Sequence, residues 1–294
     1  MTDADRLRLP DLAQMAQTGR RIAMVTAYDA PSARLADAAG LDIILVGDSA
    51  AMTVLGHEST LPVTMDEMLM LTRAVGRVVR RALVVADMPF GAYQPGEDEA
   101  LRNAIRFVKE AGADAVKLEG AGRTLTRISA ILDAGIPVMG HAGMTPQSAR
   151  LAGGYKARGR TAADARRIFD EARALERTGC FAIVLEAIPA PVAAHITTAL
   201  KVPTIGIGAG SACDGQVLVW HDLLGLTTDH VPRFVKRYAD LNQAILDALR
   251  AYVADVRSSA FPDESHTYPM PDEELARFEA QLADARPERN SMKR

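Results

Sequence analysis

The sequence predicts an α/β protein that folds as a (β/α)8 TIM barrel. Short, apolar, strand-like runs begin near residues 21, 42, 82, 115, 136, 182 and 203, with an eighth around 216–220. Helical sequence fills most of the gaps between these runs, which is the alternation of a parallel α/β protein. No GxGxxG motif follows the first strand, so a doubly wound dinucleotide-binding sheet fits the pattern less well than a barrel.

A repeated passage from helix to strand supports this prediction. It occurs in DAAGLDIILVGD (37–48), KEAGADAVKLEG (109–120), LDAGIPVMGH (132–141) and ERTGCFAIVLEA (176–187). Each copy has a glycine where a helix ends and the backbone needs a left-handed residue. These glycines are Gly40, Gly112, Gly135 and Gly179. The recurring unit is therefore one helix followed by one strand.

The starts of two helices can also be predicted. Thr64 followed by Glu67 fits a capping box, which indicates a helix running to about Arg80. Thr161 precedes a second strongly helical stretch that ends before Gly179. We expect residues 1–262 to form a single barrel domain that carries the catalytic site. Residues 263–294 are charged and interrupted by proline, and we expect a C-terminal tail with one short helix.

Composition excludes several classes of protein. The chain has 294 residues, 48% of them apolar, and a formal net charge of −3. This charge gives no basic field for a nucleic acid, and no apolar run approaches the ~20 residues of a membrane span. We expect a soluble, cytoplasmic protein that binds neither nucleic acid nor membrane. Cys180 and Cys213 lie far apart without a metal-binding pattern, so we expect buried free thiols.

Acidic residues end several of the predicted strands. Asp48 ends ILVGD, Asp87 ends LVVAD and Glu119 ends VKLE. Strand ends in a barrel converge on one face, where ligands bind, so these carboxylates would share a pocket. An aspartate after a strand often only forms a turn or caps a helix. Three together, without a histidine or cysteine ligand set, indicate a site for a hard cation such as Mg²⁺.

Three further residues belong to the same predicted pocket. Lys117 and Glu119 alternate onto one side of their strand, and we expect them to form a buried pair or to bind a charged ligand. Glu186 ends IVLE and is a candidate general base, although it could cap the next helix instead. His141 ends the fifth strand and could donate a hydrogen bond to a substrate oxygen or serve a structural role.

Two loops are weaker candidates. The glycine-rich segment IGIGAGS (205–211) follows the seventh strand, where many barrels bind phosphate. The basic segment GYKARGR (154–160) could cover the site or bind an anionic tail, although loops of this kind are commonly solvated surface.

Several motifs closely resemble the ketopantoate hydroxymethyltransferase family over roughly residues 10–268. They include ILVGDS (44–49), ADMPFGAY (86–93), VKLEG (116–120), PVMGHAGMTPQS (137–148), VLEAIP and IGIGAGSACDGQVLVWHDLLGL (205–226). The resemblance implies a Mg²⁺-dependent (β/α)8 barrel that commonly assembles as a homodecamer. It also implies transfer of a hydroxymethyl group from 5,10-methylenetetrahydrofolate to 3-methyl-2-oxobutanoate, giving ketopantoate through a Mg-stabilised enolate in pantothenate biosynthesis.

The resemblance also implies a role for each matching residue. By motif, Asp48 and Asp87 bind the metal and contact substrate, and Ser49 contacts substrate. Lys117 binds the substrate carboxylate, Glu119 lies at or near the metal, and Glu186 is the base.

Three alternative functions are weighed against this one. The nearest is a lyase or mutase of the isocitrate lyase type, but the Lys-Lys-Cys-Gly-His segment of those lyases does not occur here. A class II pyruvate aldolase would differ in not needing folate. A catalytically silent barrel that serves assembly predicts loss of the acidic residues, all of which are present.

Overall fold

The computed structural model describes residues 6–148, 154, 156–228 and 231–284, and confirms the predicted barrel. Eight parallel strands close in sequence order, β1 pairing with β8. The strands are β1 (Ile22–Thr26), β2 (Ile43–Val46), β3 (Leu83–Asp87), β4 (Ala115–Glu119), β5 (Val138–Gly143), β6 (Ala182–Glu186), β7 (Thr204–Ile207) and β8 (Gly215–Leu218). Each begins within about two residues of its predicted start or range.

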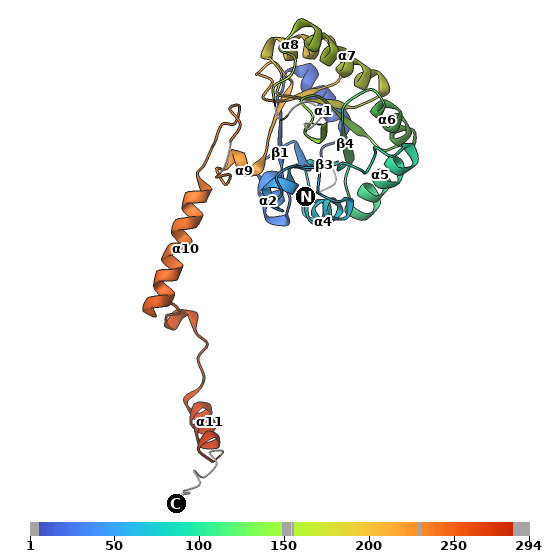
Figure 1. Ribbon diagram of the computed structural model, residues 1–294. Coiled ribbons are helices and arrows are strands. Elements are labelled where there is room, and N and C mark those ends of the chain that lie inside the picture. The colour runs from blue at the N-terminus through green and yellow to red at the C-terminus, as the bar shows by residue number, and fades with distance from the viewer. Residues whose placement is uncertain (1–5, 149–153, 155, 229–230, 285–294) are drawn as a thin grey trace, which may run out of the picture. The chain divides into compact units, whose positions relative to one another are not determined.

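Helices surround the barrel, as Figure 1 shows. The helices within residues 6–228 are α1 (Leu9–Thr18), α2 (Ala30–Ala38), α3 (Ala50–Thr53), α4 (Met65–Gly76), α5 (Glu97–Ala111), α6 (Thr124–Asp133), α7 (Ala162–Thr178), α8 (Ala190–Ala199) and α9 (Trp220–Leu223). A single 3-10 turn, η2 (Pro146–Ser148), follows β5.

Local chemistry explains where these helices begin and end. The side chain of Thr64 accepts a hydrogen bond from the N–H of Glu67, and the Glu67 carboxylate accepts one from the N–H of Thr64, which confirms the capping box of α4. This helix ends at Gly76, a turn earlier than predicted. Gly112 and Gly179 follow α5 and α7 with φ of 73° and 111°, the left-handed conformation expected for both.

The barrel interior contains an apolar layer. Alternate residues of the strands form this layer, among them Leu83 and Val85 of β3 and Met139 of β5. Leu12 and Met15 of α1 are buried in the same cluster, at the amino ends of the strands. A second, larger cluster packs the outer faces of the strands against the surrounding helices. The interior layer therefore leaves only the carboxyl ends of the strands for polar side chains.

The chain divides into two compact units, residues 1–240 and 241–294. This division precedes the boundary expected near residue 262, so the assignment of 241–262 to the barrel domain stays a prediction. The second unit contains α10 (Leu241–Ser258) and α11 (Asp272–Asp284), neither of which has a buried residue. Among the described residues, no helix combines the length and the apolar character needed to span a membrane.

Candidate active site

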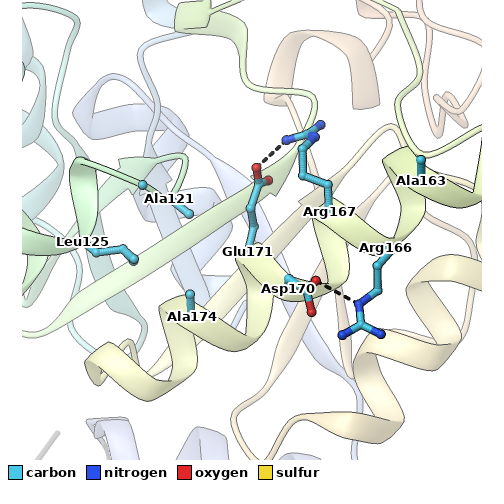
Figure 2. Close-up of a pocket in the computed structure, with 9 residues that line it drawn as sticks. Ala121, Leu125, Ala163, Arg166, Arg167, Asp170, Glu171 and Ala174 are labelled. Atoms are coloured by element: carbon cyan, nitrogen blue, oxygen red, sulfur yellow. Dashed lines mark hydrogen bonds and ion pairs between the residues drawn. The ribbon is translucent and has the colours of Figure 1, made fainter.

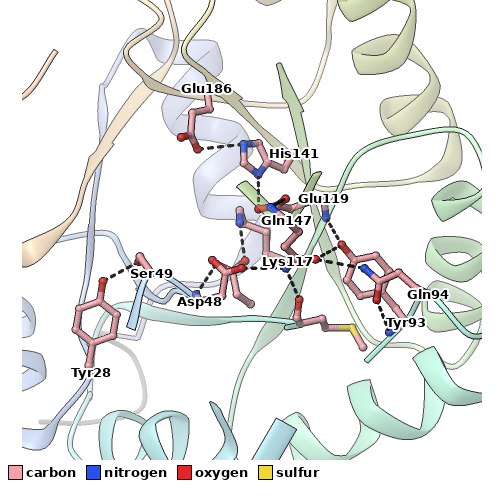
Figure 3. A network of polar contacts seen from close by, with 12 residues as sticks. Tyr28, Asp48, Ser49, Tyr93, Gln94, Lys117, Glu119, His141, Gln147 and Glu186 are labelled. Atoms are coloured by element: carbon pink, nitrogen blue, oxygen red, sulfur yellow. Dashed lines mark hydrogen bonds and ion pairs between the residues drawn. The ribbon is translucent and has the colours of Figure 1, made fainter. Parts of the chain in front are cut away.

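Strand alternation brings the predicted site residues together at the carboxyl ends of the strands. Asp87 is two residues beyond the interior residue Val85, and Lys117 and Glu119 continue from the interior residue Ala115. His141 follows Met139 in the same way, and Glu186 follows Val184. These side chains therefore point into the barrel just above its apolar layer, where Figure 3 shows their contacts.

Lys117 and Asp87 are neighbours in the register of β4 and β3. Lys117 Nζ lies 2.6 Å from Asp87 Oδ1, and both side chains are buried. Burial opposes the ammonium charge, but the charges of Asp87, Glu119 and Asp48 outweigh it and raise the pKa of Lys117. Lys117 thus forms its ion pair with Asp87 and not with Glu119. Residues on adjacent strands lie only about 4.8 Å apart, whereas residues i and i+2 of one strand are about 6.6 Å apart.

Asp48 and Ser49 follow β2 at the same end of the barrel. The N–H of Asp48 donates to Asp87 Oδ2 over 3.1 Å, which ties the two aspartates together. Burial, reinforced by the charges of Asp87 and Glu119, raises the pKa of Asp48 well above its ordinary value. Ser49 Oγ is 2.8 Å from the hydroxyl of the buried Tyr28, which fixes its orientation.

His141 lies between two carboxylates. Its Nδ1 is 3.5 Å from Glu119 Oε1 and its Nε2 is 3.3 Å from Glu186 Oε2. The distances are those of ion pairs, but neither nitrogen meets hydrogen-bond geometry, so the attraction is mainly electrostatic. Burial and the charge of Lys117 disfavour protonation, yet the two carboxylates outweigh them and raise the pKa of His141 to about 9. The ring is thus an imidazolium that faces carboxylates on both sides.

Glu119 and Glu186 differ in their access to solvent. The Glu119 side chain is 3% exposed, and its Oε2 accepts a hydrogen bond from the N–H of Gln147 over 3.0 Å. Burial opposes its ionisation, but the contact with His141 and the charges of His141 and Lys117 lower the pKa of Glu119. Glu186 is 15% exposed, which makes it the better placed of the two to meet a substrate.

Gln147 was not predicted as a site residue. It lies in η2, six residues after His141, and its amide contacts Asp48. Its only signal in the sequence is its place in the MTPQS segment that follows β5. Tyr93, whose hydroxyl donates to Gln147 Oε1 over 2.7 Å, was also not predicted. Its only signal in the sequence is its place in the ADMPFGAY segment (86–93).

The other predicted features lie around this pocket. In the basic segment, the N–H of Arg158 donates to the carbonyl of Ala187, next to Glu186, and its guanidinium is 3.7 Å from Asp164. Tyr155 of that segment lies outside the described residues. Across residues 6–148, 154, 156–228 and 231–284, no group of three or more His, Cys, Asp or Glu side chains is arranged to hold a metal ion.

Two cavities are lined by residues outside this polar cluster. One, of about 500 Å³, is a groove over α6 and α7, shown in Figure 2. Its arginines are already paired, Arg166 with Asp170 and Arg167 with Glu171, so it offers no free charge to a ligand. The other, of about 1210 Å³, is lined largely by residues of β1, β8 and the loop after β7. It includes Gly208, Gly210 and Ser211 of the glycine-rich segment and Ala157 of the basic segment, but none of the predicted acids, Lys117 or His141. We locate the site by its chemistry, at the carboxyl ends of the strands.

A buried array of ionisable side chains at the carboxyl ends of barrel strands is the arrangement of a TIM-barrel enzyme. The family model for ketopantoate hydroxymethyltransferase matches residues 6–264. The chain therefore belongs to the ketopantoate hydroxymethyltransferase family.

Its relatives agree with this assignment. The 3-methyl-2-oxobutanoate hydroxymethyltransferase of Carboxydothermus hydrogenoformans is 52% identical over 274 residues, covering 93% of this chain and 99% of the relative. The protein of the same name from Moorella thermoacetica is 55% identical over 268 residues, covering 91% of this chain and all of the relative.

Solved structures resemble the chain in fold alone. A phosphonopyruvate hydrolase crystallised with oxalate and Mg²⁺ has a TM-score of 0.57 at 16% identity, with 97% of each chain covered. A 2,3-dimethylmalate lyase of the PEP mutase/isocitrate lyase superfamily has a TM-score of 0.55 at 16% identity, covering 93% of this chain and 98% of the lyase.

Proposed function

We propose that the chain transfers a hydroxymethyl group from 5,10-methylenetetrahydrofolate to 3-methyl-2-oxobutanoate. Keto acid, methylenetetrahydrofolate and water would give ketopantoate and tetrahydrofolate, a step of pantothenate biosynthesis. The names of the relatives support the substrate. The observation that carries the proposal is the partly exposed Glu186 carboxylate, held 3.3 Å from His141 above a buried lysine and three buried acids.

The donor atoms suit Mg²⁺. Asp48 and Asp87 offer hard carboxylate oxygens, and Mg²⁺ in proteins is usually bound by one or two carboxylates together with water and substrate oxygens. The crowded charges that raise the pKa of Asp48 would also be relieved by a cation. Asp48 and Asp87 would hold the ion, with Glu119 at or near it. When bound, Mg²⁺ would withdraw electrons from the ketone of the keto acid and increase the acidity of its C3–H bond.

The remaining roles follow from the side chains. Glu186 would accept the C3 proton, and the electron pair of that C–H bond would form the new bond to the methylene carbon. Both bonds from that carbon to the folate nitrogens would break, the nitrogens would take up the C3 proton and one proton of water, and the remaining hydroxyl would bind the carbon. His141, as an imidazolium, would orient Glu186, and its contact with a substrate oxygen would use the Nε2–H that faces Glu186, shared between the two oxygens. Lys117 would bind the substrate carboxylate while keeping its contact with Asp87, and the Ser49 hydroxyl would add a further contact.

The location and assembly of the protein are part of the same proposal. We place it in the cytoplasm and expect a homo-oligomer, a decamer by its resemblance to the family. Exposed apolar side chains on α10 and α11, such as Leu249 and Phe278, support self-association. Light scattering coupled to size-exclusion chromatography would measure the mass, and a monomer at micromolar concentration would contradict the expectation.

One assay tests the function. The purified protein is incubated with 3-methyl-2-oxobutanoate, methylenetetrahydrofolate and Mg²⁺, and ketopantoate is measured by mass spectrometry. We expect product only with all three components, loss of product after chelation, and recovery on adding Mg²⁺. Cleavage or formation of a keto acid without folate would instead favour an aldolase or lyase.

A further inference from the structure

Gln147 is the centre of the buried polar network in Figure 3. Its side chain is enclosed, with the residue only 6% exposed. Its Nε2 donates to Asp48 Oδ2 over 3.0 Å and to the carbonyl of Met88 over 2.9 Å. Its Oε1 accepts from the Tyr93 hydroxyl over 2.7 Å and from Gln94 Nε2 over 3.3 Å. The amide thus uses both of its N–H donors and both lone pairs of its oxygen.

This set of partners permits one orientation of the amide. Rotating it by half a turn would place Oε1 against the Met88 carbonyl, which cannot donate, and against Asp48, which cannot donate while it is ionised. It would also direct an N–H at the amide nitrogen of Gln94, which is itself a donor. A buried amide whose reversed orientation loses several hydrogen bonds is held firmly, since each buried unsatisfied polar group costs about 1–3 kcal/mol. Tyr93, itself buried, fixes the amide, and the amide in turn fixes the Asp48 carboxylate.

The backbone of the same residue acts on a second carboxylate. The N–H of Gln147 donates to Glu119 Oε2, while Oε1 of that carboxylate faces His141. One residue therefore orients two acids that come from different strand ends. Among the described residues, the side-chain amide of Gln147 is the only group that hydrogen-bonds the Asp48 carboxylate, leaving Oδ1 free of such a bond.

We propose that Gln147 is a positioning residue that presents Asp48 Oδ1 to a divalent cation, through a side-chain bond that is itself held by Tyr93. This role rests on the proposed function of the same site, and Gln147 touches neither the reacting atoms nor the ion. Partners that orient metal-binding carboxylates are commonly worth about 10- to 100-fold in metal affinity.

The test compares Mg²⁺ binding by calorimetry in the full-length protein and three variants. Gln147→Leu keeps the volume and the backbone N–H to Glu119 but removes the bond to Asp48. We expect its affinity for Mg²⁺ to fall about 10-fold or more. Tyr93→Phe should give a smaller loss in the same direction, because Gln94 still supports the amide. Gln216→Leu is the matched control, since Gln216 is exposed and, within the described part of the chain, its amide bonds only the carbonyl of Gly210.

Catalysis provides the second readout. In the Gln147→Leu variant, raising Mg²⁺ should restore most of the lost turnover, whereas a variant with a merely disrupted fold would not recover. Unchanged Mg²⁺ affinity in Gln147→Leu overturns the proposal, and so does a loss in Gln216→Leu of the same size. If the leucine variant does not fold, unchanged affinity in Tyr93→Phe overturns it. Mg²⁺ binding by the wild type without ketopantoate formation would refute the proposed function and leave this role standing.

Discussion

Lys117 and Asp87 form a buried ion pair across the β3–β4 register, with 2.6 Å between Nζ and Oδ1. Removing one partner of such a pair leaves an uncompensated buried charge, which costs about 3–5 kcal/mol. Lys117→Met should therefore lower the free energy of unfolding by an amount in this range. Urea denaturation followed by circular dichroism measures it.

The double variant Lys117→Met/Asp87→Asn removes both charges while keeping a side-chain oxygen to accept the N–H of Asp48. It should therefore be more stable than Lys117→Met alone although it carries one more substitution. A double variant that is less stable than the single one would show that the pair does not dominate the energetics at this position.

Glu186→Gln should abolish proton transfer while leaving the pocket intact. The amide retains the size of the side chain but cannot accept the C3 proton as a carboxylate does. We expect deuterium exchange at C3 of 3-methyl-2-oxobutanoate, followed by NMR with Mg²⁺ and without folate, to slow by about 10²-fold or more. Calorimetry should show that the keto acid still binds. Exchange close to the wild-type rate would remove Glu186 from the role of base.

Gly143→Ala should disturb Glu186 through the backbone. Gly143 has a φ of 101°, and an added Cβ would overlap the carbonyl oxygen of Glu186. Strain and displacement together should cost about 1–3 kcal/mol in unfolding free energy and should also slow C3 exchange. Gly112→Ala is the control, because Gly112 also has a positive φ but no atom within 4 Å of its added Cβ. Equal slowing of exchange in both variants would contradict the explanation.

Cys180 should make stability depend on alkaline pH. Burial raises the pKa of its thiol from 9.0 to about 12, so the folded protein holds this proton more tightly than the unfolded chain does. The contribution is complete below about pH 9 and is lost as pH rises from 9 towards 12. At pH 10 it should have fallen by about 1 kcal/mol. Urea denaturation at pH 7.5 and 10 measures the fall.

Cys180→Ala isolates this contribution from the other groups that titrate at alkaline pH. The variant will be less stable at both pH values because it leaves a cavity, but it should lose less stability between them than the wild type. Parallel losses in the two proteins would show that the thiol does not carry the effect. Native Cys180 should also react slowly with iodoacetamide until the protein unfolds.

The features that the sequence predicted correctly depend on local sequence patterns. The strand starts, the left-handed glycines after α5 and α7, and the Thr64–Glu67 capping box each depend on a few adjacent residues, so the sequence could reveal them. The convergence of Asp48, Asp87 and Glu119 could also be predicted, because parallel strands in a barrel end on the same face.

The unpredicted part depends on neighbours that are distant in sequence. Lys117 pairs with Asp87 because the barrel register places them side by side, and no pattern within β4 carries that information. The bond from Gln147 to Asp48 joins residues 99 positions apart. An amide in a loop has many ordinary explanations, and only the folded chain shows that this one faces a carboxylate.

Leu12 and Met15 of α1 pack beneath the interior layer, against the amino ends of the strands. We therefore expect substrate and product to enter and leave at the carboxyl ends of the strands. If both use this opening, product must leave before the next substrate can bind, and product in solution would compete with substrate.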